Sequence, residues 1–145
     1  MNDTPGDDRT RSLPPGMTRD CVEPWEYLEF SPNGDVKPCC ARPAVGNLAH
    51  STLTQIQRAN PMRRIKLGLL TGQMDSICRH CRIAPPVEPS ALIARVRELM
   101  QAIGLPAGFD AAQYYKANPD VAESKMPAEQ HFLGWGRLAG RPLKP

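Results

Sequence analysis

Apolar residues recur at helical spacing most clearly between residues 90 and 104. Ser90 suits the cap of such a helix, and Gly104 and Pro106 suit its end. The stripe consists of Leu92, Ile93, Val96, Leu99, Met100 and Ile103. This spacing predicts an amphipathic helix. We interpret its stripe as core packing. A partner-binding face is the alternative, if the surrounding module is too small to cover the stripe.

An upstream segment has the pattern of a β-hairpin. Residues 25–30 have the aromatic content of a strand, and the Asn-Gly pair at 33–34 is the strongest short signal for a hairpin turn. Residues 36–37 begin a returning strand that a proline cuts off. The predicted hairpin brings the adjacent cysteines at 39–40 back toward Cys21.

Two helices are predicted between the hairpin and the last cysteines. Thr52 and Gln55 have the spacing of a capping box, which predicts that the first helix begins there. Asn60 and Pro61 suit the N-cap and first position of a second helix, which ends at Gly72.

The composition of the 145-residue chain allows only a small core. Hydrophobic residues make up 41% of the chain and aromatic residues 6%, while 16 prolines and 11 glycines favour short elements and many loops. Small cores often need a metal or a disulfide to stabilise them.

Charge and hydropathy argue against two classes of protein. The net charge of +3 is mixed along the chain, without the dense basic stripe of a nucleic-acid-binding protein. The one local basic cluster, Arg63, Arg64 and Lys66, we interpret as a solvated helix face. No apolar run has the length of a membrane span, and residues 1–8 do not resemble a signal peptide. We therefore expect a cytoplasmic protein.

Five cysteines in a reducing compartment point to metal or redox chemistry rather than to disulfides. Cys78 and Cys81 form a C-x-x-C knuckle, whose spacing lets two sulfurs bind one centre. Cys21 and one cysteine of the pair at 39–40 can complete a four-thiolate site. Adjacent side chains of an extended chain face opposite sides, so we favour Cys39 as the ligand and leave Cys40 as a spare or alternate ligand. Thiolates are soft ligands that select zinc, copper(I) or iron–sulfur clusters, and spacing alone does not separate these.

The cysteines belong to a set of ordered motifs. These are Cys21-Val22-Glu23-Pro24-Trp25, Gly34-Asp35-Val36-Lys37-Pro38-Cys39-Cys40, Gly46-Asn47-Leu48, Arg63 or Arg64, and Cys78-Arg79-His80-Cys81. In that order they resemble the motifs of the SPASM domain, the auxiliary cluster domain found at the C-terminus of radical SAM enzymes. The resemblance runs from about Cys21 to Arg82.

The resemblance implies one [4Fe–4S] cluster with Cys21, Cys39, Cys78 and Cys81 as ligands. Fuller family members carry further cysteines for a second cluster, but no cysteine follows Cys81 here. The chain also lacks the C-x-x-x-C-x-x-C loop and the length of the barrel that radical SAM chemistry needs.

The residues beside the C-x-x-C knuckle could support such a site. Arg79, Arg82 and His80 could offset the negative charge of a thiolate-ligated cluster and donate hydrogen bonds to sulfur. The alternative is that they are ordinary exposed loop residues.

The end of the chain resembles a second motif, of the form F-D-x-x-x-Y…N-P-D-V…H-[YF]…G…G-R, which recurs in bacterial proteins beside glycosyltransferase and polysaccharide domains. The matching segments are Phe109-Asp110, Tyr114-Tyr115, Asn118-Pro119-Asp120-Val121, His131-Phe132, Gly134-Trp135-Gly136 and Gly140-Arg141-Pro142. We predict a helical packing unit in which Asp110 and Asp120 are N-caps and Tyr115, Phe132 and Trp135 share a core. Asp120 and His131 are interpreted as structural rather than as a catalytic pair.

The predicted fold class is small α+β: one β-hairpin plus short helices around a four-cysteine metal site, with an all-helical C-terminal module. The predicted parts are a disordered tail over 1–19, a cysteine-rich domain over 20–84, a Pro-rich linker over 85–89 and the helical module over 90–145.

Two functions follow from the cysteine set. The leading hypothesis is an iron–sulfur accessory protein that transfers electrons to, or positions substrate for, a separate and possibly radical SAM enzyme. The alternative is a structural module for protein interaction that binds one zinc ion through four cysteines. Without the SAM-cleaving loop, we expect no complete enzyme.

Overall fold

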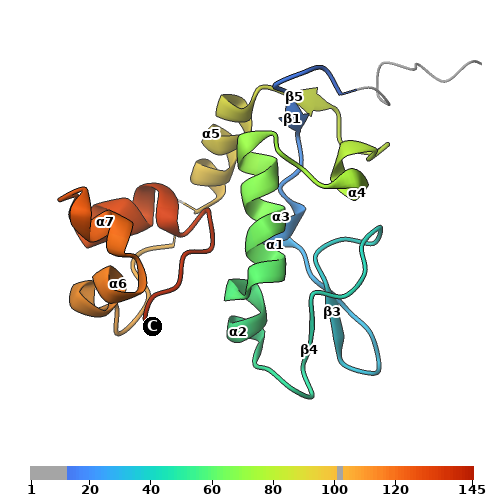
Figure 1. The fold of residues 1–145 in the computed structure, drawn as a ribbon. Helices are drawn as coiled ribbons and strands as arrows, with labels where there is room; N and C mark the ends of the chain where they lie inside the picture. The colour runs from blue at the N-terminus through green and yellow to red at the C-terminus, as the bar shows by residue number, and fades with distance from the viewer. Residues whose placement is uncertain (1–12, 101–102) are drawn as a thin grey trace, which may run out of the picture.

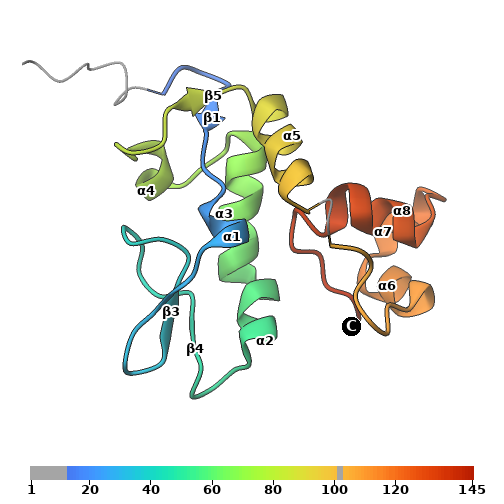
Figure 2. The same ribbon diagram turned by 180° about the vertical axis from the view of Figure 1, so that it is seen from behind.

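The computed structural model describes residues 13–100 and 103–145, and these form a small α+β fold as predicted. Helix α3 (Asn60–Thr71) stands at the centre, with a three-stranded sheet on one side and the C-terminal helices on the other (Figure 1). Figure 2 shows the same order from behind. Within the described residues, no helix has the length and apolar character required to cross a membrane.

The predicted β-hairpin is confirmed, although its first strand is shorter than expected. Strand β2 (Glu29–Phe30) pairs antiparallel with β3 (Asp35–Lys37), which also pairs with β4 (Gly46–Asn47). Gly34 has a positive φ of 92°, and a Cβ there would lie 2.9 Å from the side-chain oxygen of Asn47. Glycine is therefore required at this turn on both counts.

The first two residues of the strand predicted over residues 25–30 are instead part of helix α1 (Glu23–Glu26). Pro24 stands in the first turn of this helix, where a missing N–H costs nothing. The indole Nε1 of Trp25 donates a hydrogen bond to the carbonyl oxygen of Leu138, 2.8 Å away. That contact spans most of the chain, so the local pattern did not indicate it.

The boundary of the predicted disordered tail was wrong for its last residues. Residues 1–12 lie outside the described residues, but Thr18–Arg19 form the fully buried strand β1. This strand pairs antiparallel with β5 (Pro86–Val87), which lies in the segment predicted to be a Pro-rich linker. Each strand is therefore stabilised by pairing with the other, and neither segment is an unpaired linker.

One core joins the cysteine-rich segment to the helix predicted after it. That helix is α5 (Pro89–Met100), and it packs against α3. The core consists of Val22, Ile65, Leu69, Leu70, Met74, Leu92, Val96 and Leu138. Leu92 and Val96 are fully buried, which confirms core packing for the centre of the stripe, while Leu99 and Ile103 remain exposed. The helical module predicted over 90–145 thus shares its core with the domain before it.

Helix α2 (Leu53–Arg58), which precedes α3, begins with the signal read from the sequence. Thr52 and Gln55 form the complete capping box of α2. The prediction of Asn60 as the N-cap of α3 was wrong by one residue, because Ala59 is the N-cap and Asn60 and Pro61 lie in the first turn, without a side-chain cap hydrogen bond. Gly72 ends α3 in the left-handed conformation. The basic cluster on α3 is not a uniformly solvated face, because Lys66 is only 8% exposed. The interpretation of that cluster was therefore wrong for Lys66.

The C-terminal helices pack around a second, smaller core. They are α6 (Ala111–Ala117), α7 (Pro119–Glu123) and α8 (Ala128–His131), followed by a π-helical turn, η2 (Phe132–Gly136). The buried residues of this core are Tyr114, Val121, Ala128 and Phe132.

The predictions for individual residues of this unit are partly correct. Asp110 caps α6 as predicted, accepting a hydrogen bond from the backbone of Gln113 at 3.1 Å. Asp120 is not an N-cap, because it lies within α7, whose N-cap is Asn118. Its carboxylate accepts hydrogen bonds from Arg141 at 2.7 and 2.8 Å. Tyr115 contacts this core from its edge, whereas Trp135 packs against the core around α3.

Candidate metal centre

The cysteines lie on three separate segments that meet beside α3. Cys21 lies between β1 and α1, and Cys39 and Cys40 follow β3. Cys78 is in helix α4 (Ser76–Arg79), and Cys81 follows it. All five are free thiols, and Cys40 is the exposed one.

Four of the thiol-bearing residues line one cavity of about 520 Å³: Cys21, Cys39, Cys40 and Cys81. Three of the four predicted ligands therefore line the same cavity. The fourth, Cys78, lines an adjoining hollow with Arg42 and Asp75. Its thiol nevertheless interacts electrostatically with those of Cys21 and Cys39.

The surroundings of the Cys21 thiol favour its neutral form. Burial raises its pKa to about 11, and the charges of Cys78 and Cys81 add to this effect. A backbone hydrogen bond from Glu23 acts in the opposite direction. Thiolates crowded this way are stabilised by a shared cation, so metal binding here would release protons.

Helix α4 is fixed at its start by Asp75. The carboxylate of Asp75 accepts a hydrogen bond from the backbone N–H of Cys78 at 3.2 Å and caps the helix. This cap sets the direction in which the C-x-x-C knuckle leaves α3.

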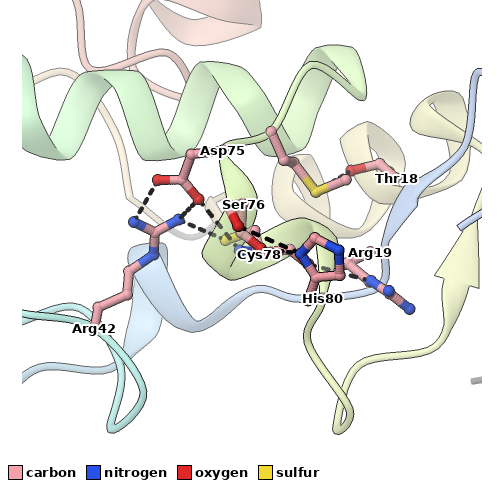
Figure 3. A network of polar contacts seen from close by, with 8 residues as sticks. Thr18, Arg19, Arg42, Asp75, Ser76, Cys78 and His80 are labelled. Atoms are coloured by element: carbon pink, nitrogen blue, oxygen red, sulfur yellow. Dashed lines mark hydrogen bonds and ion pairs between the residues drawn. The ribbon is translucent and has the colours of Figure 1, made fainter. Parts of the chain in front are cut away.

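Arg42 contacts both Asp75 and Cys78 (Figure 3). Its guanidinium donates two hydrogen bonds to Asp75, at 2.8 and 2.6 Å, and one to the Sγ of Cys78, at 2.8 Å. Burial alone would lower the pKa of Arg42, but these partners outweigh it and raise that pKa. The same hydrogen bonds lower the pKa of Asp75. Arg42 thereby ties the loop after Cys39 to the helix of Cys78.

Burial raises the pKa of the Cys78 thiol, and the hydrogen bond from Arg42 opposes that rise. A guanidinium at a sulfur atom is the kind of contact that stabilises a thiolate ligand. No local pattern indicated this role of Arg42, because it depends on a contact between residues 36 positions apart.

Arg19 supports the knuckle from the opposite side (Figure 3). Its side chain is fully buried and donates hydrogen bonds to the carbonyl oxygens of Cys78, Arg79 and Ala84, at 3.2, 2.5 and 3.3 Å. These carbonyls lie at and beyond the end of α4, where a helix leaves its last backbone acceptors to outside partners, although that of Cys78 also accepts from the N–H of Cys81 at 3.2 Å. Arg19 was assigned to the disordered tail, so this role was also missed.

The residues predicted to surround the cluster lie differently from expectation. Arg79, His80 and Arg82 are exposed. The Nδ1 of His80 lies 2.8 Å from the carbonyl oxygen of Ser76 and donates to it (Figure 3). The charge-offsetting role of Arg79 and Arg82 stays a prediction, whereas Arg42 already contacts a thiol.

Because Arg42 donates a hydrogen bond to a thiol and Arg79 is exposed, we expect the two arginines to affect the reduction potential of a bound cluster differently. Replacing Arg42 with glutamine is expected to lower the reduction potential of a bound cluster, because the oxidised, less negative state loses less stabilisation than the reduced state. Arg79→Gln is expected to lower it less. Potentiometric titration of both variants checks this, and an equal or larger effect of Arg79→Gln would contradict the assignment. Arg42→Lys, which keeps the charge, separates charge from hydrogen-bond geometry.

The donor set fits an iron–sulfur group. Five free thiols, four of them around one cavity and a fifth with a guanidinium at its sulfur, are soft donors with a cationic neighbour. Among residues 13–100 and 103–145, no group of three His, Cys, Asp or Glu side chains is placed so that it could hold a metal ion. The full ligand set Cys21, Cys39, Cys78 and Cys81 therefore stays a prediction.

Free thiols gathered around one cavity are the donor set of a cysteine-ligated metal protein. Comparison with known families identifies which kind of cysteine-rich domain is present. Residues 21–82 match the family model of the SPASM domain, an iron-sulfur cluster-binding domain. The match confirms the resemblance drawn from the motifs over the same segment. The resemblance of the C-terminal segment to a second motif stays a prediction. Neither the curated proteins nor the solved structures include a significant match to the chain.

Proposed function

We propose that the chain binds one [4Fe–4S] cluster through Cys21, Cys39, Cys78 and Cys81. The observation that carries this proposal is the gathering of cysteines from three segments beside α3, within the segment that matches an iron-sulfur cluster-binding domain. Cys40 is the exposed cysteine, which agrees with its place as a spare or alternate ligand.

The proposed role is that of an accessory protein to a separate enzyme, which a radical SAM enzyme would fit. Such a cluster, when bound, accepts and releases single electrons. The protein's own part is to shield the four proposed ligands partly from solvent and to place Arg42 at the sulfur of Cys78. Either electron transfer or the positioning of a substrate would use this arrangement. The free thiols suit a reducing compartment, and we place the protein in the cytoplasm.

The alternative function is a structural zinc module. Four thiolates are the ligand set of many structural zinc sites, and zinc would join the same three segments. What favours the cluster over zinc is the family match, because the thiols themselves serve either metal.

Reduction of the anaerobically purified protein tests the electron-transfer role. We expect a visible absorption band that dithionite bleaches and a mild oxidant restores, over several cycles, at an unchanged iron content. A chain that holds iron and sulfide but is not reduced reversibly would leave cluster binding intact and contradict electron transfer. Substrate positioning would then be the remaining role.

A further inference from the structure

A second cavity, of about 450 Å³, lies away from the cysteines where the C-terminal segment meets α2 and α3. Four cationic residues line it: Arg58, Lys66, Arg137 and Arg141. No acidic residue is among the described residues that line it. Trp25 and Phe132 contribute to an apolar part of its wall. Its volume is in the range of small-molecule sites, about 300–1,000 Å³.

Packing alone does not explain why a lysine, Lys66, is placed in the wall of this cavity. Lys66 is 92% buried, since only 8% of its surface is exposed. It makes no hydrogen bond or ion pair within residues 13–100 and 103–145. Burial, with a smaller effect from Arg58, lowers its pKa to about 8. The stem of Lys66 is buried, but its Nζ is not among the described side-chain atoms that are buried without a partner, so the ammonium is accessible to an anion in the cavity.

The neighbouring arginines leave further positive charge without a partner. Arg58 is exposed and has no partner among the described residues. Arg137 donates through Nη1 to the carbonyl oxygens of Ile103 and Gly104, but its Nε is buried without a hydrogen-bond partner. Arg141 alone is neutralised, by its ion pair with Asp120 at 2.7 Å. Three cations therefore face the cavity without a carboxylate.

The cavity is held open by the contacts that dock the C-terminal segment. Trp25 donates to the carbonyl oxygen of Leu138, and the side chain of Leu138 is fully buried in the core around α3. Gly140 has a φ of 68°, and a Cβ there would lie 3.0 Å from Cγ of Arg63 on α3. This glycine lets the backbone approach α3, which forms the wall that carries Lys66.

We propose that this cavity is a binding site for a small organic phosphate. Three cations without a carboxylate partner suit a dianionic phosphate better than a single carboxylate. Guanidinium groups bind phosphate oxygens through two parallel hydrogen bonds, and a lysine adds a point charge. The apolar wall at Trp25 and Phe132 would receive the organic part of the ligand. The site is independent of cluster binding and gives the C-terminal segment a role in recognition.

Calorimetric titration of the full chain, cluster-loaded and at constant ionic strength in chloride buffer, tests the site. The probes are inorganic phosphate and phenyl phosphate. We expect both to bind, phenyl phosphate more tightly because of the apolar wall. Lys66→Met is expected to weaken binding at least tenfold, and Arg58→Gln severalfold. Lys116→Gln, which removes one exposed lysine on α6, is the matched control and is expected to bind as the parent does.

The variants also test the site through stability. Lys66→Met removes a charge that the surroundings disfavour, as the lowered pKa of Lys66 indicates, so it is expected to unfold at a higher temperature than the parent in phosphate-free buffer. It is also expected to lose the rise in unfolding temperature that phenyl phosphate gives the parent. The proposal would be overturned by a parent that binds neither probe at millimolar concentration. It would also be overturned by binding that Lys116→Gln weakens as much as Lys66→Met, or by phenyl phosphate binding no tighter than phosphate.

Discussion

Serine in place of Cys78 is expected to deprive the protein of its iron. Serine offers a harder oxygen donor that iron–sulfur clusters bind poorly, and at Cys78 it also removes the sulfur that accepts the hydrogen bond from Arg42. The same substitution at Cys21, Cys39 or Cys81 is expected to have a similar effect. Each variant should retain less than about a tenth of the parent's iron, because a cluster with one ligand missing is readily lost.

Cys40→Ser is the matched control for this series. It changes a thiol that is exposed and adjacent to a proposed ligand, so it makes the same chemical change without removing a ligand. We expect Cys40→Ser to keep nearly all of the iron. Iron and sulfide per chain, measured after anaerobic purification, decide the outcome. If Cys40→Ser loses its iron while Cys39→Ser keeps it, the assignment of the two neighbours is reversed.

The second large effect is expected on the free energy of unfolding when Arg19 is replaced. Methionine there would keep much of the buried volume but remove the hydrogen bonds to the carbonyl oxygens of Cys78, Arg79 and Ala84. Hydrogen bonds to a charged group contribute about 1.5–3 kcal/mol each, and acceptors left unsatisfied in the interior add a cost. Because two of the three are only partly buried, water replaces some of the loss. We expect the free energy of unfolding to fall by about 3 kcal/mol.

Urea unfolding followed by tryptophan fluorescence measures that fall. Arg82→Met is the control, because Arg82 is an exposed arginine in the same loop. We expect its effect to stay within about 0.5 kcal/mol of the parent, as for most surface substitutions. Equal effects of the two substitutions would mean that Arg19 does not support the C-x-x-C knuckle.

Short-range signals predicted much of this fold. The Asn-Gly turn before Asp35, the capping box of Thr52 and Gln55 and the cap at Asp110 each act within a few residues. Such signals are visible in the sequence because both partners lie in one short window. The prediction that the apolar stripe on α5 packs in the core was correct at its centre for the same reason, since Leu92 and Val96 are one helical turn apart.

Long-range contacts account for the elements that were missed. Strands β1 and β5 are two residues each and are stabilised by pairing with each other across most of the cysteine-rich segment. Polar composition therefore suggested disorder for Thr18 and Arg19, although both are buried. Arg42 and Asp75 are 33 residues apart, and nothing local in either loop indicates their pairing.

The candidate site was predicted more completely in its chemistry than in its geometry. The cysteine motifs identified the kind of domain, and the family match over residues 21–82 agrees with them. The motifs could not indicate which cations lie beside the thiols, because proximity in sequence favoured Arg79 whereas the fold delivers Arg42. In the same way Lys66 was grouped with Arg64 by sequence, although only Arg64 faces solvent.

Metal and sulfide analysis of the anaerobically purified chain tests the central claim most directly. The account predicts about four irons and four sulfides per chain, the stoichiometry of a cysteine-ligated [4Fe–4S] cluster, with brown colour and little zinc. A colourless protein with about one zinc per chain and neither iron nor sulfide would contradict it.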